Sequence, residues 1–182
     1  MKKFILDILF PIHCLGCGKE GKFICSRCLE QIPPSAKPIE SDKQNGLKRV
    51  IAATDYENSF VKNIIYSYKY NFVRELSKPL GILMAKALTA SLPFRPGPRA
   101  EKSFQLFCLF HRDCVLIPVP LHKKRLRWRG FNQSELLCQE IAKILNIAIT
   151  GDILSRAKNT PPQAKIKNFF QRKTNIQNAF AL

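Results

Sequence analysis

Two closely spaced pairs of cysteines constrain the start of this chain more than any other feature. Cys14 and Cys17 form the first pair, and Cys25 and Cys28 form the second. Each Cys-x-x-Cys places two thiolates on one tight turn, and two such turns can complete a tetrahedral zinc site. Four unliganded thiols are the alternative, but a module this short buries too little apolar surface to fold without a staple. We therefore predict one structural Zn²⁺ ion on these four cysteines, with His13 outside the ligand set.

The rest of the chain carries no second cysteine motif and no apolar run long enough for a transmembrane helix. Cys108, Cys114 and Cys138 lack motif spacing and are predicted to be core thiols. Asp7 interrupts the apolar stretch within residues 1–10, and no small-residue cleavage site follows it. We therefore predict a short amphipathic segment there rather than a signal peptide. We expect a cytoplasmic protein, a compartment in which clustered cysteines bind metal more often than they form disulfides.

Positive charge is abundant and unevenly distributed. The 182 residues include 30 Lys and Arg against 13 Asp and Glu, a net charge of +17. Residues 114–134 and residues 153–182 together contain eleven cations and no acidic residue. A dense patch of one sign favours a polyanionic partner such as nucleic acid, a phosphorylated metabolite or anionic lipid.

Composition and periodicity divide the chain into three parts. Residues 1–34 form the cysteine module, residues 35–49 are a polar linker, and residues 50–182 form one larger domain. Apolar periodicity predicts helices around Val61 and from Leu76 to Leu88, and Pro and Gly predict a loop at residues 91–103. The second half alternates strands and helices, which is typical of α/β proteins. We expect strands at residues 50–54, at residues 115–119 and from Ile153, and a helix near residues 164–173.

A basic stretch separates the predicted strand at residues 115–119 from the next helix. Residues 121–131 are predicted to form a loop, and Asn132 to cap the helix that follows, with Glu135 three residues later. Free amide groups at a helix start attract phosphate, and a glycine lets the backbone approach a ligand closely. The candidate binding residues are Lys123, Lys124, Arg125, Arg127, Arg129, Gly130, Asn132 and Gln133.

Three interpretations of this stretch remain open from the residues alone. It can bind a phosphorylated small molecule, or it can be a solvated basic surface without a ligand. It can also bind single-stranded nucleic acid, with Trp128 and Phe131 available to stack bases between the cations.

The chain resembles the ComF family over nearly its whole length. Pro118-Val-Pro-Leu-His122 and Arg129-Gly-Phe-Asn-Gln133 are the most specific matches. The order of parts also agrees: a ribbon of four cysteines, the stretch from Tyr56 to Tyr70, and then these two motifs. Further similarity follows in a last group of residues: Arg156, Thr160, Gln163, Arg172, Asn175 and Phe180.

This resemblance implies a type I phosphoribosyltransferase fold, a parallel sheet flanked by helices, with an N-terminal zinc ribbon. It implies that the residues around 120–131 face pyrophosphate and that a mobile loop closes over the site. The candidates for that loop are Arg156, Thr160, Gln163 and Arg172. Mg²⁺ would accompany phosphoribosyl pyrophosphate in full-length relatives. The family is linked to DNA uptake in competent bacteria, so other DNA-uptake proteins are expected partners.

The chain departs from the family at its C-terminal end. Family members continue into an apolar strand, two adjacent acidic residues and a Thr-Thr-Gly loop, which would hold the ribose and the 5′-phosphate. No two acidic residues are adjacent in this chain. We therefore expect an incomplete sheet, with an exposed edge or apolar face near residues 176–182, and ligand binding without ribosyl transfer. The alternative is a non-catalytic accessory protein that binds single-stranded DNA.

Overall fold

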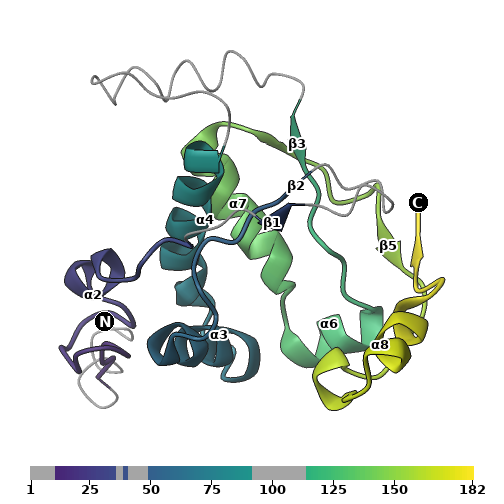
Figure 1. The fold of residues 1–182 in the computed structure, drawn as a ribbon, viewed down its shortest axis with the longest axis horizontal. Coiled ribbons are helices and arrows are strands. Elements are labelled where there is room, and N and C mark those ends of the chain that lie inside the picture. The colour runs from purple at the N-terminus through teal and green to yellow at the C-terminus, as the bar shows by residue number, and fades with distance from the viewer. Residues whose placement is uncertain (1–10, 36–38, 41–48, 92–113) are drawn as a thin grey trace, which may run out of the picture. The chain divides into compact units, whose positions relative to one another are not determined.

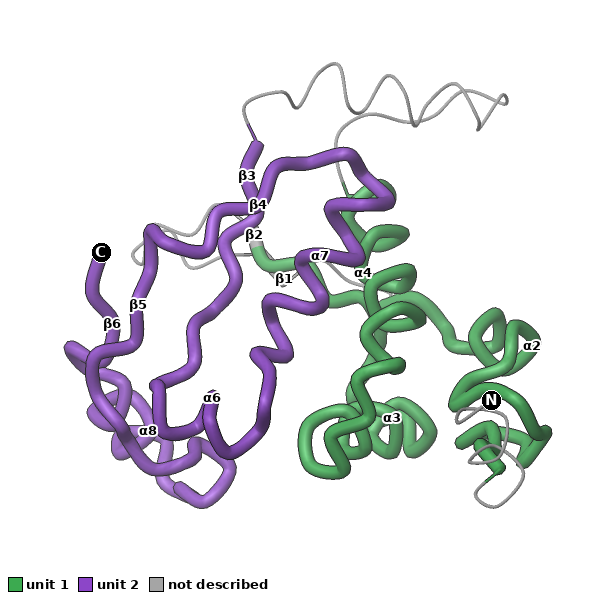
Figure 2. The backbone as a smooth tube through the Cα atoms, turned by 180° about the vertical axis from the view of Figure 1, so that it is seen from behind, with its two compact units in different colours: residues 1–110 green, residues 111–182 purple. Residues whose placement is uncertain are grey.

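The computed structural model describes residues 11–35, 39–40, 49–91 and 114–182. The chain separates into two compact units, residues 1–110 and residues 111–182 (Figure 2). The predicted amphipathic segment at residues 1–10, Cys108 and nearly all of the predicted loop at residues 91–103 lie outside the described residues. The division of the chain after residues 34 and 49 stays a prediction.

Unit 1 contains the cysteine module and two longer helices (Figure 1). Both longer helices are confirmed, and the side chain of Asn58 starts the first by accepting hydrogen bonds from the amides of Phe60 and Val61. Val61, Ile64 and Leu76 are almost completely buried and form its core. Its elements are α2 (Ser26–Glu30), β1 (Ile39–Glu40), β2 (Arg49–Val50), α3 (Ser59–Tyr70), the 3₁₀ helix η2 (Arg74–Leu76) and α4 (Ser77–Ser91).

The strand predicted at residues 50–54 is wrong beyond its first residue. β2 ends at Val50 and pairs antiparallel with β1, whereas Thr54 makes only an isolated bridge to Pro34. Pro33 and Pro34 have no N–H to donate, so a regular ladder cannot form along this segment. The Thr54 hydroxyl instead donates to the carbonyl of Pro33 at 2.8 Å.

Unit 2 is built around a small parallel pair of strands. β3 pairs with β4, and α7 lies between the two in sequence, so the three elements form a β–α–β connection. A separate antiparallel pair joins β5 to β6. The elements of unit 2 are β3 (Val115–Leu116), α6 (Lys123–Arg129), α7 (Gln133–Leu145), β4 (Ala148–Ile149), β5 (Ser155–Arg156), η3 (Gln163–Lys165), α8 (Phe169–Ile176) and β6 (Phe180–Ala181).

Two strand predictions in unit 2 need correction. The strand expected at residues 115–119 ends at Leu116 and is not buried, because Val115 is 45% exposed and Val119 is 55% exposed. Pro118 and Pro120 remove two ladder donors, and the Val119 amide donates to the Ser134 hydroxyl at 3.0 Å instead. The strand expected from Ile153 begins at Ser155. The described residues therefore form a mixed helix and strand structure with a small parallel sheet, and a larger sheet stays a prediction.

The stretch at residues 121–131, predicted to be a loop, is mostly helical. α6 covers Lys123–Arg129, where His122 Nδ1 accepts from the Lys124 amide at 3.3 Å. Gly130 ends the helix at φ +76°, a left-handed conformation that favours glycine. Lys, Arg and Leu are strong helix formers, so two caps suffice to order seven residues between them.

The predicted start of the next helix is confirmed. Asn132 caps α7, since its Oδ1 accepts from the backbone amide of Ser134 at 3.1 Å. Its side-chain Nδ2 donates to the Val119 carbonyl at 3.2 Å. Ile141 and Leu145 are buried on its inner face. The prediction of core thiols is wrong for Cys114, which is exposed, and Cys138 is only half-buried. Every helix in the described ranges is too short or too polar to cross a bilayer.

Candidate metal centre and arginine cluster

The two cysteine pairs sit on a turn and on a short helix. The amide of Cys14 donates to the Lys19 carbonyl at 2.8 Å, and the amide of Gly18 donates back to the Cys14 carbonyl at 2.9 Å. Cys25 precedes α2 and Cys28 lies on it, so the second pair is spaced by helical geometry. The Cys25 amide donates a hydrogen bond to Cys14 Sγ at 3.4 Å, which connects the two cysteine pairs.

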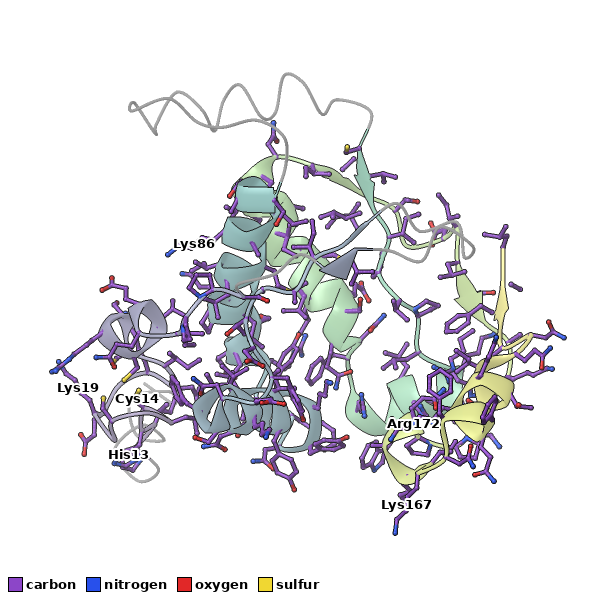
Figure 3. The ribbon with its side chains drawn as sticks, viewed as in Figure 1. His13, Cys14, Lys19, Lys86, Lys167 and Arg172 are labelled. Carbon is purple, nitrogen blue, oxygen red and sulfur yellow. The ribbon has the colours of Figure 1, made fainter. Side chains whose placement is uncertain are left out.

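This geometry brings the four sulfurs of Cys14, Cys17, Cys25 and Cys28 together (Figure 3 labels Cys14). All four Sγ atoms lie within 4.8 Å of one another, and those of Cys17 and Cys25 are 3.7 Å apart. A tetrahedral zinc ion with Zn–S bonds of about 2.3 Å separates its sulfurs by about 3.8 Å, whereas a disulfide needs about 2 Å. The donor set therefore fits a metal ion. His13 lies outside it, with Nε2 3.7 Å from Glu20 Oε1.

The surroundings of the thiols favour partial ionisation. Burial opposes ionisation of Cys14, but backbone amides of Cys17, Cys25 and Gly16 together lower its pKa to about 6. The hydrogen bond with the Cys25 side chain, together with burial, raises the pKa of Cys28 to about 12. Four neighbouring thiolates repel one another, so a cation is needed to hold all of them in the ionised form.

Gly16 lies where the cysteine module contacts α3. A Cβ atom at this position would stand 2.9 Å from Cys28 Sγ and 2.9 Å from Phe60 Cζ. Both distances are shorter than van der Waals contact. The missing side chain of Gly16 therefore lets the first cysteine turn pack between a metal-ligand candidate and the first turn of α3.

Replacing Gly16 with Ala should lower the free energy of unfolding of unit 1 by roughly 1–3 kcal/mol, the usual cost of overpacking. Because Cys28 Sγ is one of the two obstructing atoms, bound metal should also be lost faster to a chelator. Thermal denaturation and the rate of metal release measure these effects. Gly151→Ala is the matched control, since a Cβ there meets no atom within 4 Å. Equal behaviour of the two variants would refute the packing argument.

The predicted basic residues differ in how far their side chains are exposed to solvent. Lys123, Lys124 and Arg127 are exposed on α6, whereas Arg125 and Arg129 are half-buried. Arg129 Nη1 donates to Gln133 Oε1 at 2.9 Å. Asn132 is engaged in capping α7, and Gly130 in ending α6. Arg125 reaches the second group of predicted residues, because its side chain hydrogen-bonds to Thr160.

Arg125 and Arg156 converge on Thr160. Arg125 Nη2 donates to the Thr160 carbonyl, and Arg156 Nη2 donates to the Thr160 hydroxyl at 2.7 Å. The Arg156 guanidinium lies 5.3 Å from the centre of the Phe180 ring, and its Nε is buried without a hydrogen-bond partner. Burial lowers the pKa of Arg156, and the charge of Arg125 lowers it further. Within the described parts of the chain, no carboxylate forms an ion pair with either arginine.

The residues that follow are tied to α8. Gln163 Nε2 donates to the Arg172 carbonyl at 3.0 Å, and Arg172 Nε donates to the Ile166 carbonyl at 2.6 Å (Figure 3 labels Arg172). Asn175 Nδ2 donates to the Pro161 carbonyl at 3.0 Å. All four residues predicted for a loop over the site thus belong to one hydrogen-bonded region, and the closing motion stays a prediction.

The chain is similar to bacterial proteins that are named for competence and for DNA utilization. Competence protein F of Haemophilus influenzae is 39% identical in an alignment 186 residues long, gaps included. The alignment covers 94% of this chain and 75% of the relative. The chain belongs to the ComF family. DNA utilization protein YhgH of Escherichia coli (strain K12) is 28% identical over 173 residues, and that of Salmonella typhi is 26% identical over 172 residues. The chain spans 64% of the length of these two relatives. No family model and no solved structure matches it.

Two features of the site in this ComF-family chain were not predicted from its sequence. Phe131, which one of the three open interpretations made available for stacking beside Trp128, is only 6% exposed and belongs to the core, whereas Trp128 is 67% exposed. The contact of Gly16 with Phe60 was also missed. No sequence pattern distinguishes the two neighbouring aromatics, because burial depends on what packs against each ring. Phe60 is the second residue of α3 after the Asn58 cap, and no local pattern at this position predicts its contact with Gly16.

Proposed function

We propose that unit 2 binds a phosphorylated ligand of the phosphoribosyl pyrophosphate class at Arg125 and Arg156. The observation that supports this proposal is the convergence of two guanidinium groups on Thr160, with no carboxylate of the described residues in an ion pair with either of them. Two like charges at one residue repel each other, and a phosphate would offset that repulsion. The planar guanidinium also suits two-pronged hydrogen bonding to phosphate oxygens. Lys123, Lys124 and Arg127 on α6 would add to the attraction of an anion.

The resemblance extends the proposal to fold and chemistry. We propose a type I phosphoribosyltransferase-like arrangement for residues 50–182, with Arg156, Thr160, Gln163 and Arg172 closing over the ligand and Mg²⁺ bound with it in full-length relatives. Binding of such a ligand is the function that we propose for this chain.

The metal ion that we propose for the four cysteines is structural zinc. Four thiolates are the usual donor set of structural zinc sites, and they leave no open coordination position for a substrate or an activated water. The ion would hold residues 11–35 together and would keep their contact with Phe60. The proposed role of the ion is therefore to stabilise the fold of unit 1. Thiolate ligation suits a reducing compartment such as the cytoplasm.

Calorimetric titration tests the ligand proposal directly. Phosphoribosyl pyrophosphate with Mg²⁺ should bind the full chain measurably, and inorganic pyrophosphate should compete with it. Titrations in which phosphoribosyl pyrophosphate gives no binding heat would overturn the proposal.

Single-stranded DNA is the second candidate ligand of the same surface. The exposed ring of Trp128 lies on the helix that carries five cations, and stacking between cations is a common way of binding unpaired bases. The relatives named for competence and DNA utilization support a role in DNA uptake, with other DNA-uptake proteins as partners. Burial of Phe131 leaves this alternative one stacking ring fewer than expected.

A further inference from the structure

Unit 1 presents three exposed tyrosines and two exposed lysines on and beside α3. Tyr56 is 61% exposed, Tyr66 is 57% exposed and Tyr70 is 44% exposed, and Lys62 and Lys69 are exposed as well. These five residues are called the tyrosine face here. The residues on the inner side of the helix, Val61, Ile64 and Tyr68, are at most 2% exposed. The tyrosine face therefore takes little part in the core, and its rings need another explanation.

The rings of the tyrosine face are arranged as a platform. The centres of the Tyr66 and Tyr70 rings are 5.0 Å apart, with an angle of 44° between their planes. The two residues are one helical turn apart, so both rings lie on one side of α3. Lys62 Nζ lies 5.9 Å from the centre of the Tyr56 ring. Flat aromatic surface and mobile ammonium groups thus alternate along the helix.

Charge on this helix has one sign. Residues 58–74 include Lys62, Lys69 and Arg74 and contain no Asp or Glu. The nearest acidic residues in sequence, Asp55 and Glu57, precede the helix, and Glu75 follows it. A surface that interleaves aromatic rings with cations is complementary to a strand with exposed base faces and regularly spaced phosphates.

We propose that the tyrosine face binds single-stranded nucleic acid, with bases stacked on Tyr66 and Tyr70 and phosphates near Lys62 and Lys69. A duplex hides its base faces, so it should bind more weakly. The face lies on a well-supported helix, because Phe60 of α3 packs against Gly16 of the cysteine module. The inference goes beyond the function proposed for unit 2, since it concerns a different unit and needs neither Arg125 nor Arg156.

Fluorescence anisotropy of labelled twelve-nucleotide oligothymidylate and oligouridylate tests the proposal on the full chain. Loss of base stacking costs about 1 kcal/mol or more per ring, so Tyr66→Ala combined with Tyr70→Ala should weaken binding at least about twentyfold. Tyr66→Phe with Tyr70→Phe should stay within about twofold of the unchanged chain, because the rings remain. Binding of both oligonucleotides identifies recognition of any single strand, and binding of oligothymidylate alone identifies DNA.

Lysine variants provide the electrostatic part of the test. Lys62→Gln with Lys69→Gln should flatten the slope of log affinity against log salt by roughly one to two units, since two phosphate contacts are lost. Lys86→Gln is the matched control, an exposed lysine on α4 away from the face (Figure 3). Unchanged affinity of the alanine pair would overturn the inference, and so would equally tight binding of duplex DNA. Loss of oligonucleotide binding in Arg125→Ala with Arg156→Ala alone would move the strand to unit 2 and leave the second candidate function standing.

Discussion

Purified protein should contain close to one zinc ion per chain, and Cys14→Ser or Cys25→Ser should remove it. The expectation follows from four sulfurs within 4.8 Å of one another and a separation of 3.7 Å between Cys17 and Cys25. Structural zinc contributes about 10–16 kcal/mol in small modules, as much as the whole stability of a typical domain. A serine hydroxyl is a poor substitute for a thiolate, so residues 11–35 should unfold with the loss of the ion.

Metal analysis and limited proteolysis measure the two parts of this prediction. Cys114→Ser is the matched control, because Cys114 is an exposed cysteine outside the cluster, and this variant should keep its zinc. The cysteine variants should be cut within residues 11–35 under conditions that leave the control intact. Zinc-free protein in which this segment still resists protease would contradict the structural role of the ion.

Arg125→Ala combined with Arg156→Ala should abolish measurable binding of phosphoribosyl pyrophosphate, a loss of at least about a hundredfold. Hydrogen bonds to a charged group contribute about 1.5–3 kcal/mol each, and the two guanidinium groups can each supply at least one. Both side chains are half-buried and held by Thr160, so little ordering entropy opposes ligand binding. Calorimetric titration of the variant measures the loss.

Lys158→Ala is the control for charge alone, since Lys158 is an exposed cation two residues from Arg156. It should change the affinity for the phosphosugar by no more than a few-fold. If single-stranded DNA is the ligand of unit 2, the arginine pair should instead flatten the salt dependence of binding by roughly one to two units, with affinity retained at low salt. Equal losses from Lys158→Ala and from the arginine pair would show a diffuse basic surface rather than a site.

The cysteine cluster and three helices could be predicted from local sequence. Cys14 and Cys28 are close in the chain, so two turns are enough to bring their sulfurs together. The apolar periods around Val61 and Ile141 predicted α3 and α7, and the side chain of Asn132 caps α7 as expected because capping is a contact between residues two apart. The helix at Lys123–Arg129 also has local signals, since His122 caps its start and Gly130 ends it. It was nevertheless predicted to be a loop, because of its many charges.

Contacts between distant segments were decided only by the tertiary structure. Arg125 is 35 residues from Thr160 in sequence, and no local pattern predicts that Arg125 and Arg156 share this residue. Gly16 must be small because Phe60 packs against it, and Phe131 is buried while Trp128 is exposed. The backbone conformation of a short segment sets which of its own side chains share a face. Whether such a face is exposed to solvent, is buried in a core or contacts a side chain such as Arg156 depends on how segments distant in sequence pack together.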